Sequence, residues 1–367
     1  MATTLIDETT PSNEGIQQDG NELLETENTS ETALSADAKD FSESGIPSGG
    51  DRQFALKGVP SSVELEQPGS IAPSRLAIVM AVGLPPLGMA IGMVLAVTVG
   101  GLSPWFLALV LGGWVATGLG ITVGYHRMVA HRSFKTHGWV RAFWMALGAM
   151  ALEGCPLQWS TVHRKHHKHS DQEVDPHTPY KKGHGLWKGL FFSHIGWMFR
   201  QHTFIEDINR FSPDLRKDPV VMFFHRTYVY WILLSALIPM FIGYLIQPNW
   251  LGVVYGLLFG AGARLLWTHH ITWSINSVCH VFGSRPFESK DKSTNNFLFG
   301  ILALGEGWHN NHHAFPNSAR HGLRWWQFDL SWVVIRSLKF AGLVWDVKTP
   351  SSRELQSRSV KKASASS

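Results

Sequence analysis

The chain of 367 residues is long enough for one or two domains. Its charge is divided unevenly, because residues 1–70 hold 14 Asp and Glu against three Lys and Arg, whereas the rest holds 14 against 29. The basic part also carries long apolar runs and many tryptophans, which favours a membrane over nucleic acid as its partner. Two cysteines without a CxxC motif argue against a disulfide framework.

Three regions are predicted along the chain. Residues 1–74 form a disordered acidic N-terminal tail, because they are rich in polar residues and cannot bury enough apolar surface to offset chain entropy. They also lack the pattern of a secretory signal, and their acidity argues against an organelle transit peptide. Residues 75–346 form a membrane domain, and residues 347–367 form a flexible C-terminal tail.

Four segments are apolar enough to cross a bilayer, which needs about 20 helical residues. They cover residues 76–99, 104–124, 227–246 and 250–272. Short uncharged connections predict two helical hairpins. Residues 142–152, 186–199 and 324–345 are expected to form helices in the membrane interface.

The long segment between the second and third spans holds 15 Lys and Arg against eight Asp and Glu. By the positive-inside rule, this segment and both termini are predicted to be cytoplasmic. Arg264 lies inside the fourth predicted span, where an unpaired charge is costly. It is either a functional residue or a long side chain that reaches the interface.

Three histidine-rich boxes stand out on the predicted cytoplasmic side. Two of them share the pattern HxxHH: His163, His166 and His167 in one, and His309, His312 and His313 in the other. On a helix, positions i, i+3 and i+4 lie on one face. The upstream box places His126 and His131 about 140° apart on a continuous α-helix, so these two converge only if the helix ends near them.

Imidazole is a good ligand for iron, copper or zinc. Eight converging imidazoles exceed what one ion binds, so the boxes predict two metal ions. Structural zinc sites close at four ligands, usually with several thiolates, and this chain has only two cysteines, far apart in sequence. A pH-sensing or interfacial histidine cluster is the plainer alternative. Two HxxHH boxes together with HxxxxH argue against it.

Charged residues near the boxes are candidates for supporting roles. Metal-bound imidazoles usually donate their second N–H to a carboxylate or carbonyl. The carboxylates close to the boxes in sequence are Glu153, Asp171, Asp175 and Glu306. The cations Arg164, Lys165 and Lys168 are candidates for binding a phosphate head group. A solvated surface position is the alternative for each.

Four stretches resemble the membrane fatty acyl desaturases of the Δ9 (stearoyl-CoA or acyl-lipid) type: GYHRMVAHRSF, HRKHHKHSDQEVDPHTP, WSINSVCHVFG and GEGWHNNHHAFPNSARHG. The resemblance covers residues 76–345. It implies a ninth metal histidine at His280, a water-mediated metal contact from Asn276, and an acyl tunnel lined by Trp159. It further implies two iron ions, O2 as co-substrate and a cis double bond at Δ9.

Details of the resemblance bear on the partners. Animal members carry Arg-Asp before the second box, where this chain has Thr161 and Val162. This difference favours an acyl lipid or another acyl carrier over acyl-CoA bound as in the animal members. The chain has neither an HPGG heme signature nor CxxC pairs. A separate donor, ferredoxin-like or cytochrome b5-like, is therefore expected to supply the electrons. The expected location is a bacterial inner membrane, or the endoplasmic reticulum or plastid membrane of a eukaryote.

The sequence thus predicts an all-α integral membrane protein. Four transmembrane helices in two hairpins carry a cytoplasmic helical cap, and the cap holds a histidine-rich site for two metals. A fatty acyl or alkane hydroxylase of the same class is the nearest alternative, because the same oxidant can place oxygen on carbon. A non-catalytic metal transporter is a remote alternative, since transporters place polar ligands within the spans.

Overall fold

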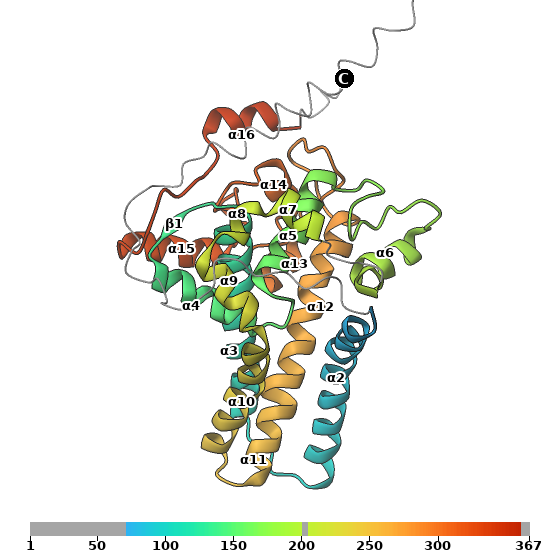
Figure 1. The fold of residues 1–367 in the computed structure, drawn as a ribbon, viewed down its shortest axis with the longest axis vertical. Coiled ribbons are helices and arrows are strands. Elements are labelled where there is room, and N and C mark those ends of the chain that lie inside the picture. Colours follow the sequence, from blue (N-terminus) through green and yellow to red (C-terminus); the bar gives the residue numbers. More distant parts are fainter. Residues whose placement is uncertain (1–70, 200–204, 361–367) are drawn as a thin grey trace, which may run out of the picture. The chain divides into compact units, whose positions relative to one another are not determined.

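The computed structural model describes residues 71–199 and 205–360, and this part is mostly helical (Figure 1). Of the predicted tail at residues 1–74, residues 1–70 lie outside the described part, and residues 71–74 begin the first helix. Among the described residues, four helices are long and apolar enough to cross a membrane: Leu76–Thr98, Trp105–Ala130, Tyr228–Ile246 and Trp250–His280. The four predicted spans are confirmed, and the second and fourth extend farther toward the histidines than expected.

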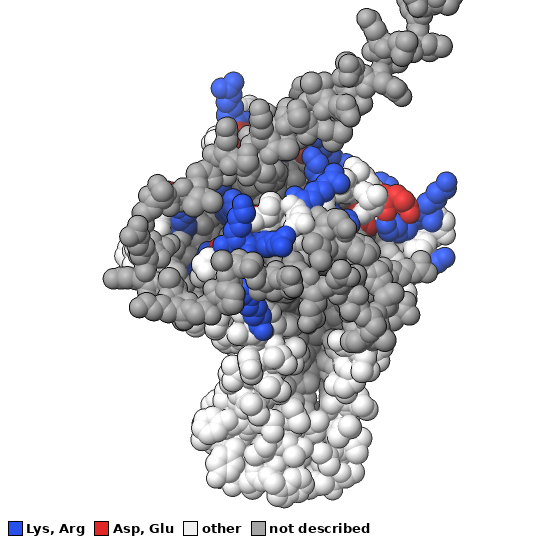
Figure 2. Space-filling view, viewed as in Figure 1, with Lys and Arg blue, Asp and Glu red and all other residues white. Residues whose placement is uncertain are grey.

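The spans are built from α2 (Ile71–Thr98), α3 (Trp105–Leu119) with the π-helical η2 (Gly120–Ala130), α10 (Tyr228–Ile246), and α11 (Trp250–Tyr255) with η4 (Gly256–Ala263), α12 (Arg264–Ser277) and η5 (Val278–His280). Large apolar side chains on them, such as Leu84, Val94 and Phe241, are exposed. On the face shown in Figure 2, the described residues of the spans carry no charge. Such a surface suits a lipid environment, in which helices satisfy their own backbone groups.

Helix packing within the spans depends on close backbone contacts. α2 packs on η4, and α10 packs on both α11 and η4. A Cβ atom on Gly243 would collide with the carbonyl oxygen of Gly252, and one on Gly256 would collide with that of Pro239. Small residues at such crossings are typical of membrane helices. The hydrophobic effect does not drive helices together within a bilayer, so their association depends on close packing.

The other helices gather at one end of the spans, and we call this part the cap (Figure 1). They are α4 (Gly138–Ala149), α5 (Pro156–His169), α6 (Leu186–His194), η3 (Gly196–Phe199), α7 (Ile205–Phe211), α8 (Pro213–Arg216), α9 (Pro219–Arg226), α13 (Phe297–Leu302), α14 (His309–Ala314), α15 (Leu330–Phe340) and α16 (Ser352–Arg358). The antiparallel pair β1 (Lys135–Thr136) and β2 (Val344–Trp345) joins two distant loops. The three further predicted helices correspond to α4, to α6 with η3, and to α15.

The main hydrophobic core lies where η2, α4, α5 and α9 meet. Val123, Met145, Leu157 and Val221 are completely buried in it. Burying such side chains contributes about 1.5–3 kcal/mol each. The same core fixes the helix that carries the first histidine box against the helix that carries the second.

The predicted flexible C-terminal tail is corrected for residues 347–360. The main-chain N–H of Ala319 donates to the carbonyl of Lys348, and that of Val360 donates to the carbonyl of Pro286. Ser351 caps α16 with Glu354 in a reciprocal pair of hydrogen bonds. The segment is ordered because loops of the cap accept and donate its backbone hydrogen bonds. Residues 361–367 lie outside the described part.

Arg264 is buried inside the protein and does not reach the interface. It is 2 % exposed, and its guanidinium donates to the carbonyl oxygens of Gly260, Met150 and Ser235. The Ser235 hydroxyl lies 2.7 Å from the same guanidinium. These bonds tie α12 to α10 and to the end of α4, so Arg264 holds the helix bundle together at this level.

Candidate metal centre

The first histidine box lies on a π-helical segment, and this explains how its two histidines meet. In η2 the backbone hydrogen bonds join residues five apart, and the N–H of His131 donates to the carbonyl of His126 at 3.0 Å. The wider turn brings positions i and i+5 to the same side. The two imidazole rings lie 4.8 Å apart between centroids, and the helix ends at Ala130, as expected.

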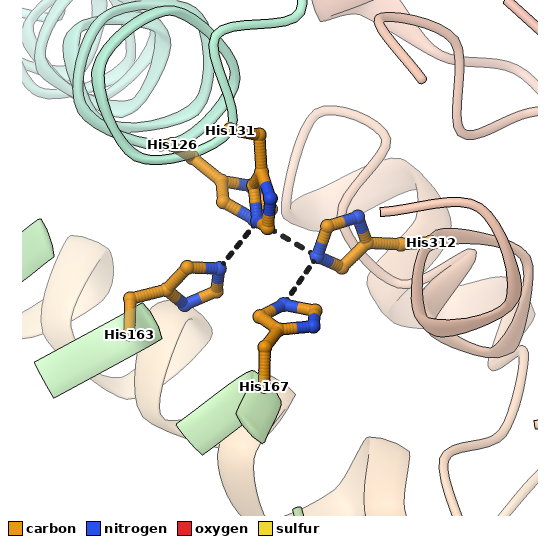
Figure 3. Close-up of side chains that lie close together, drawn as sticks. All are labelled: His126, His131, His163, His167 and His312. Carbon is orange, nitrogen blue, oxygen red and sulfur yellow. Dashed lines mark hydrogen bonds between the residues drawn. The ribbon is translucent and has the colours of Figure 1, made fainter. Parts of the chain in front are cut away.

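Five histidines form the first group, in which one nitrogen of each lies within 4.8 Å of the others: His126, His131, His163, His167 and His312. Figure 3 shows their rings pointing toward a common centre from three parts of the chain. The Nε2 atom of His312 lies 3.0 Å from that of His126 and 2.8 Å from that of His167. Burial, and next the nearby His126, hold the pKa of His163 well below its usual range, which favours the neutral, metal-binding form.

Four buried histidines form the second group: His166, His280, His309 and His313. The Nε2 atoms of His280 and His309 lie 3.0 Å apart. The two groups are adjacent, because the ring of His167 stacks on that of His313 with centroids 4.4 Å apart. All nine histidines predicted as metal ligands therefore lie in two neighbouring clusters, a division that their spacing did not predict.

Carboxylates face the Nδ1 atoms of four of these histidines. The pairs are Glu306 with His126 at 2.7 Å, Asp175 with His166 at 3.0 Å, Asp171 with His280 at 3.1 Å, and Asp291 with His313 at 2.6 Å. A carboxylate at Nδ1 fixes the ring and leaves the Nε2 lone pair available for a metal. Burial raises the pKa of Asp291, but the charge of His313 and hydrogen bonds from His313 and Ser293 lower it well below its usual range overall.

The contact between His166 and His313 tests whether the site suits a metal. Both Nδ1 atoms face carboxylates, so both Nε2 atoms present lone pairs, and these lie 3.4 Å apart. Two lone pairs at this distance repel unless a cation lies between them. Converging neutral imidazoles are the donor set that iron, copper and zinc prefer, so the residues fit a pair of metal ions.

Glu153 takes a different place from the other predicted carboxylates. It accepts a hydrogen bond from Nε1 of Trp159 at 3.2 Å, and the Trp159 ring stacks on His163 with centroids 5.0 Å apart. Burial raises the pKa of Glu153 to about 7. Glu153 therefore supports the first group through Trp159.

The cations beside the second box are held by the cap itself. Arg164 donates to Asp214 at 2.7 Å and to the carbonyl of Ala130 at 2.9 Å, and Lys165 lies 2.9 Å from Asp207. These contacts connect α5 to α7, α8 and the end of η2. A head-group role for Arg164, Lys165 and Lys168 remains a prediction.

Three residues that support the site were missed in the sequence. Besides Asp291, these are Arg127, which donates to Glu306 at 3.1 Å, and His321, whose Nδ1 atom lies 3.1 Å from Glu306. Arg127 lies inside the first box, and His321 is the fifth residue of the stretch NSARHG. Their closeness to the boxes was the available signal, but no spacing rule distinguishes such residues from surface charges.

An apolar pocket lies beside both histidine groups. Its wall runs from Trp114 in the second span to Leu304 before the third box, and it includes His163 of the first histidine group and His309 of the second. Trp159 and Asn276, which the resemblance placed near the substrate and the metal, also line it. Mostly apolar walls with polar groups at one end suit a ligand that is largely hydrocarbon.

The chain is similar in sequence to known proteins. The sequence model of the fatty acid desaturase family matches residues 76–346. The chain is 41% identical over 235 residues to the sn-1 stearoyl-lipid 9-desaturase of Anabaena variabilis, covering 64% of this chain and 80% of that protein. It is 42% identical over 235 residues to the Acyl-CoA 5-desaturase AL21 of Anemone leveillei, covering 63% and 68%. It is 41% identical over 236 residues to the Delta-9 acyl-lipid desaturase 1 of Arabidopsis thaliana, covering 64% and 72%.

Proposed function

Since the chain belongs to the fatty acid desaturase family, we propose that it introduces a cis double bond at Δ9 of a saturated fatty acyl chain. Family membership identifies it as an oxidoreductase, and the four apolar helices among its described residues support a membrane protein. The observation that carries the proposal is the apolar pocket whose wall includes histidines of both groups.

The position and the carrier are proposed from the relatives and the second box. Two of the relatives named above are 9-desaturases of acyl lipids, and one is a 5-desaturase of acyl-CoA. Thr161 and Val162 stand where animal members carry Arg-Asp, and this favours an acyl-lipid substrate over acyl-CoA.

The two histidine groups are proposed to hold two iron ions, with Asn276 contacting one of them through water. When bound, the irons would supply the O2-dependent oxidation of unactivated CH2 groups, which acid–base groups cannot perform. One O2, two electrons and two protons are consumed as the acyl chain loses two hydrogens, and two water molecules form. A separate ferredoxin-like or cytochrome b5-like donor provides the electrons.

The residues of the chain orient the reaction. Glu306, Asp171, Asp175 and Asp291 hold the imidazole rings, and the pocket walls exclude water around two neighbouring CH2 groups. The charge of the segment between the second and third spans supports a cytoplasmic site. An acyl chain can then enter from the membrane without crossing bulk water.

Product analysis in a host that lacks its own desaturase tests the function. Lipid classes are separated, and double bonds are located by mass spectrometry after derivatisation. A new cis-Δ9 monoene is expected, and its distribution among lipid classes indicates the carrier. A hydroxy acid would assign the chain to the hydroxylases instead. Metal flux into proteoliposomes without O2 consumption would indicate a transporter.

A further inference from the structure

We propose that an acidic one-electron carrier docks on an exposed lysine-rich surface beside the second histidine group and delivers electrons there. The proposal rests on the proposed desaturase function and names where its electron donor binds. The surface, here called the donor surface, consists of Tyr180, Lys182, Lys290 and Lys292. All four side chains are exposed, Tyr180 by 36%.

The donor surface brings together two distant segments of the chain. The ammonium group of Lys292 lies 3.8 Å from the centre of the Tyr180 ring. The main-chain N–H of Lys292 donates to the Asp171 carboxylate at 2.7 Å. The segments around residues 180 and 290 therefore form one continuous patch. A cation–π contact at the surface and a hydrogen bond to the Asp171 carboxylate hold these segments together.

Hydrogen bonds connect this patch directly to histidines of the second group. The Tyr180 hydroxyl donates to the carbonyl oxygen of His280 at 2.7 Å. Asp171, which holds the N–H of Lys292, also accepts from Nδ1 of His280 at 3.1 Å. The neighbour of Lys292 in sequence, Asp291, contacts His313.

All four histidines of the second group are buried, so an electron carrier docks at a distance from their imidazoles. The rate of electron transfer falls steeply with distance. At a given distance, electron transfer is faster through hydrogen-bonded groups than across gaps between atoms. The Tyr180 ring is exposed and lies one hydrogen bond from the backbone of His280. This makes the patch a short path from the surface to a metal ligand.

The positive charge of the donor surface is available to a partner. Within the part of the chain that the structure describes, no carboxylate forms an ion pair with Lys182, Lys290 or Lys292, whereas Asp214 and Asp207 pair with Arg164 and Lys165. Glu173 lies close by, but its carboxylate accepts from the main-chain N–H of Lys182 at 3.0 Å and not from the ammonium group. A surplus of positive charge steers a partner of opposite sign and speeds its association. The carrier that fits is therefore acidic around its redox centre.

A substrate head group is the competing occupant for these lysines. The pocket wall includes none of the four residues of the donor surface. The contacts of the patch lead instead to His280 and His313, neither of which lines the pocket. The geometry therefore favours electron delivery over substrate binding.

The test reverses charge on Lys182 and Lys290, whose side chains touch no histidine of either group. The purified full chain, with iron bound, is supplied with a saturated acyl substrate and with electrons from two sources. One source is NADPH, ferredoxin reductase and an acidic plant-type ferredoxin, and the other is dithionite with a small uncharged mediator. The variant Lys182→Glu with Lys290→Glu is compared with Lys217→Glu, an exposed lysine that follows α8 elsewhere in the cap.

We expect the double variant to weaken binding of oxidised ferredoxin to the full chain, measured as a Kd by calorimetry in detergent, about tenfold at low salt. The KM for ferredoxin should rise by a similar factor, and both effects should be smaller at high salt. The ratio of ferredoxin-driven to mediator-driven turnover should fall by a similar factor, whereas Lys217→Glu should leave this ratio near that of wild type. An unchanged KM for ferredoxin would overturn the proposal. A raised KM for the acyl substrate alone would also overturn it, in favour of head-group binding. Wild-type protein that makes no unsaturated product with either source would contradict the desaturase function itself.

Discussion

At the scale of single residues, the carboxylates at Nδ1 decide which imidazole nitrogen is available to a metal. Asp291 is the clearest case, because its carboxylate lies 2.6 Å from His313 and also accepts from the Ser293 hydroxyl. Removing such a partner usually costs about 10- to 100-fold in metal affinity, because the ring loses its fixed tautomer and orientation. We therefore expect Asp291→Ala to lower iron affinity by that factor.

Iron titration of the purified protein measures this loss. Glu288→Ala is the matched control, since Glu288 is exposed on the same loop. Equal iron affinity of the two variants would show that Asp291 does not position His313.

The histidines themselves provide the second prediction. His166→Ala, His280→Ala and His312→Ala are each expected to abolish desaturation while the protein still inserts into the membrane. His270→Ala should retain activity, because His270 pairs with His194 outside both groups. Product analysis on membranes with equal protein content measures the effect. Near-normal turnover in any of the first three variants would remove that residue from the proposed ligand set.

Glu153 provides a prediction about pH. Burial raises its pKa from 4.5 to about 7, so the unfolded chain releases this proton at lower pH than the folded chain. The folded state therefore loses stability as pH rises from about 4.5 to about 7, by about 3 kcal/mol in total. Glu153→Gln should remove this loss while still accepting a hydrogen bond from Trp159.

Thermal unfolding in detergent between pH 5 and pH 8 measures this loss of stability. The unfolding temperature of Glu153→Gln should increase relative to that of wild type as pH rises. Parallel profiles for the two proteins would show that Glu153 does not titrate in this range.

At the scale of elements, the contact between η2 and α4 positions the first histidine box. A Cβ atom on Gly148 would lie 2.7 Å from the Tyr125 ring and 2.8 Å from the carbonyl oxygen of Gly120. Neither neighbour can move without shifting η2, which carries His126. Glycine at this position therefore lets the two helices touch.

Gly148→Ala is expected to lower the free energy of unfolding by about 1–3 kcal/mol, because overpacking forces the helices apart. It should also weaken iron binding, since η2 moves with its histidine. Gly112→Ala is the control, because Gly112 lies in α3 and a Cβ there meets nothing within 4 Å. Thermal unfolding and iron content measure both effects. Equal unfolding temperatures for the two variants would contradict the close-contact argument.

At the scale of the whole molecule, the C-terminal segment supports the second histidine group from outside. Ser359 pairs with Phe287, and Arg358 donates to the carbonyl of Ala314. Phe287 begins the loop that carries Asp291, and Ala314 ends α14, the helix of the third box. The segment thus clamps two parts of the site.

Ending the chain at Lys348 should therefore lower iron content and the unfolding temperature, because the contacts with Phe287 and with Ala314 are both lost. A chain that ends at Val360 keeps every described contact and should match wild type. Metal analysis and thermal unfolding compare the two proteins. Wild-type iron content in the shorter chain would show that the clamp is dispensable.

The sequence by itself determined the fold class and the kind of site. Apolar runs of about 20 residues predict helices that span a bilayer. The bilayer core holds no water to pair with backbone N–H and C=O groups, and a helix pairs these groups internally. The HxxHH spacing likewise places histidines on one helix face through local geometry alone. The four spans, the histidine rows on α5 and α14, and the family were accessible for these reasons.

Tertiary structure decided what depends on distant parts of the chain. The division of nine histidines into groups of five and four, the role of Asp291, and the burial of Arg264 all arise from contacts between separate elements. The same holds for the order of residues 347–360, whose backbone bonds are made by distant loops. A sequence pattern reports local periodicity and composition, whereas these features follow from how packed helices bring remote side chains together.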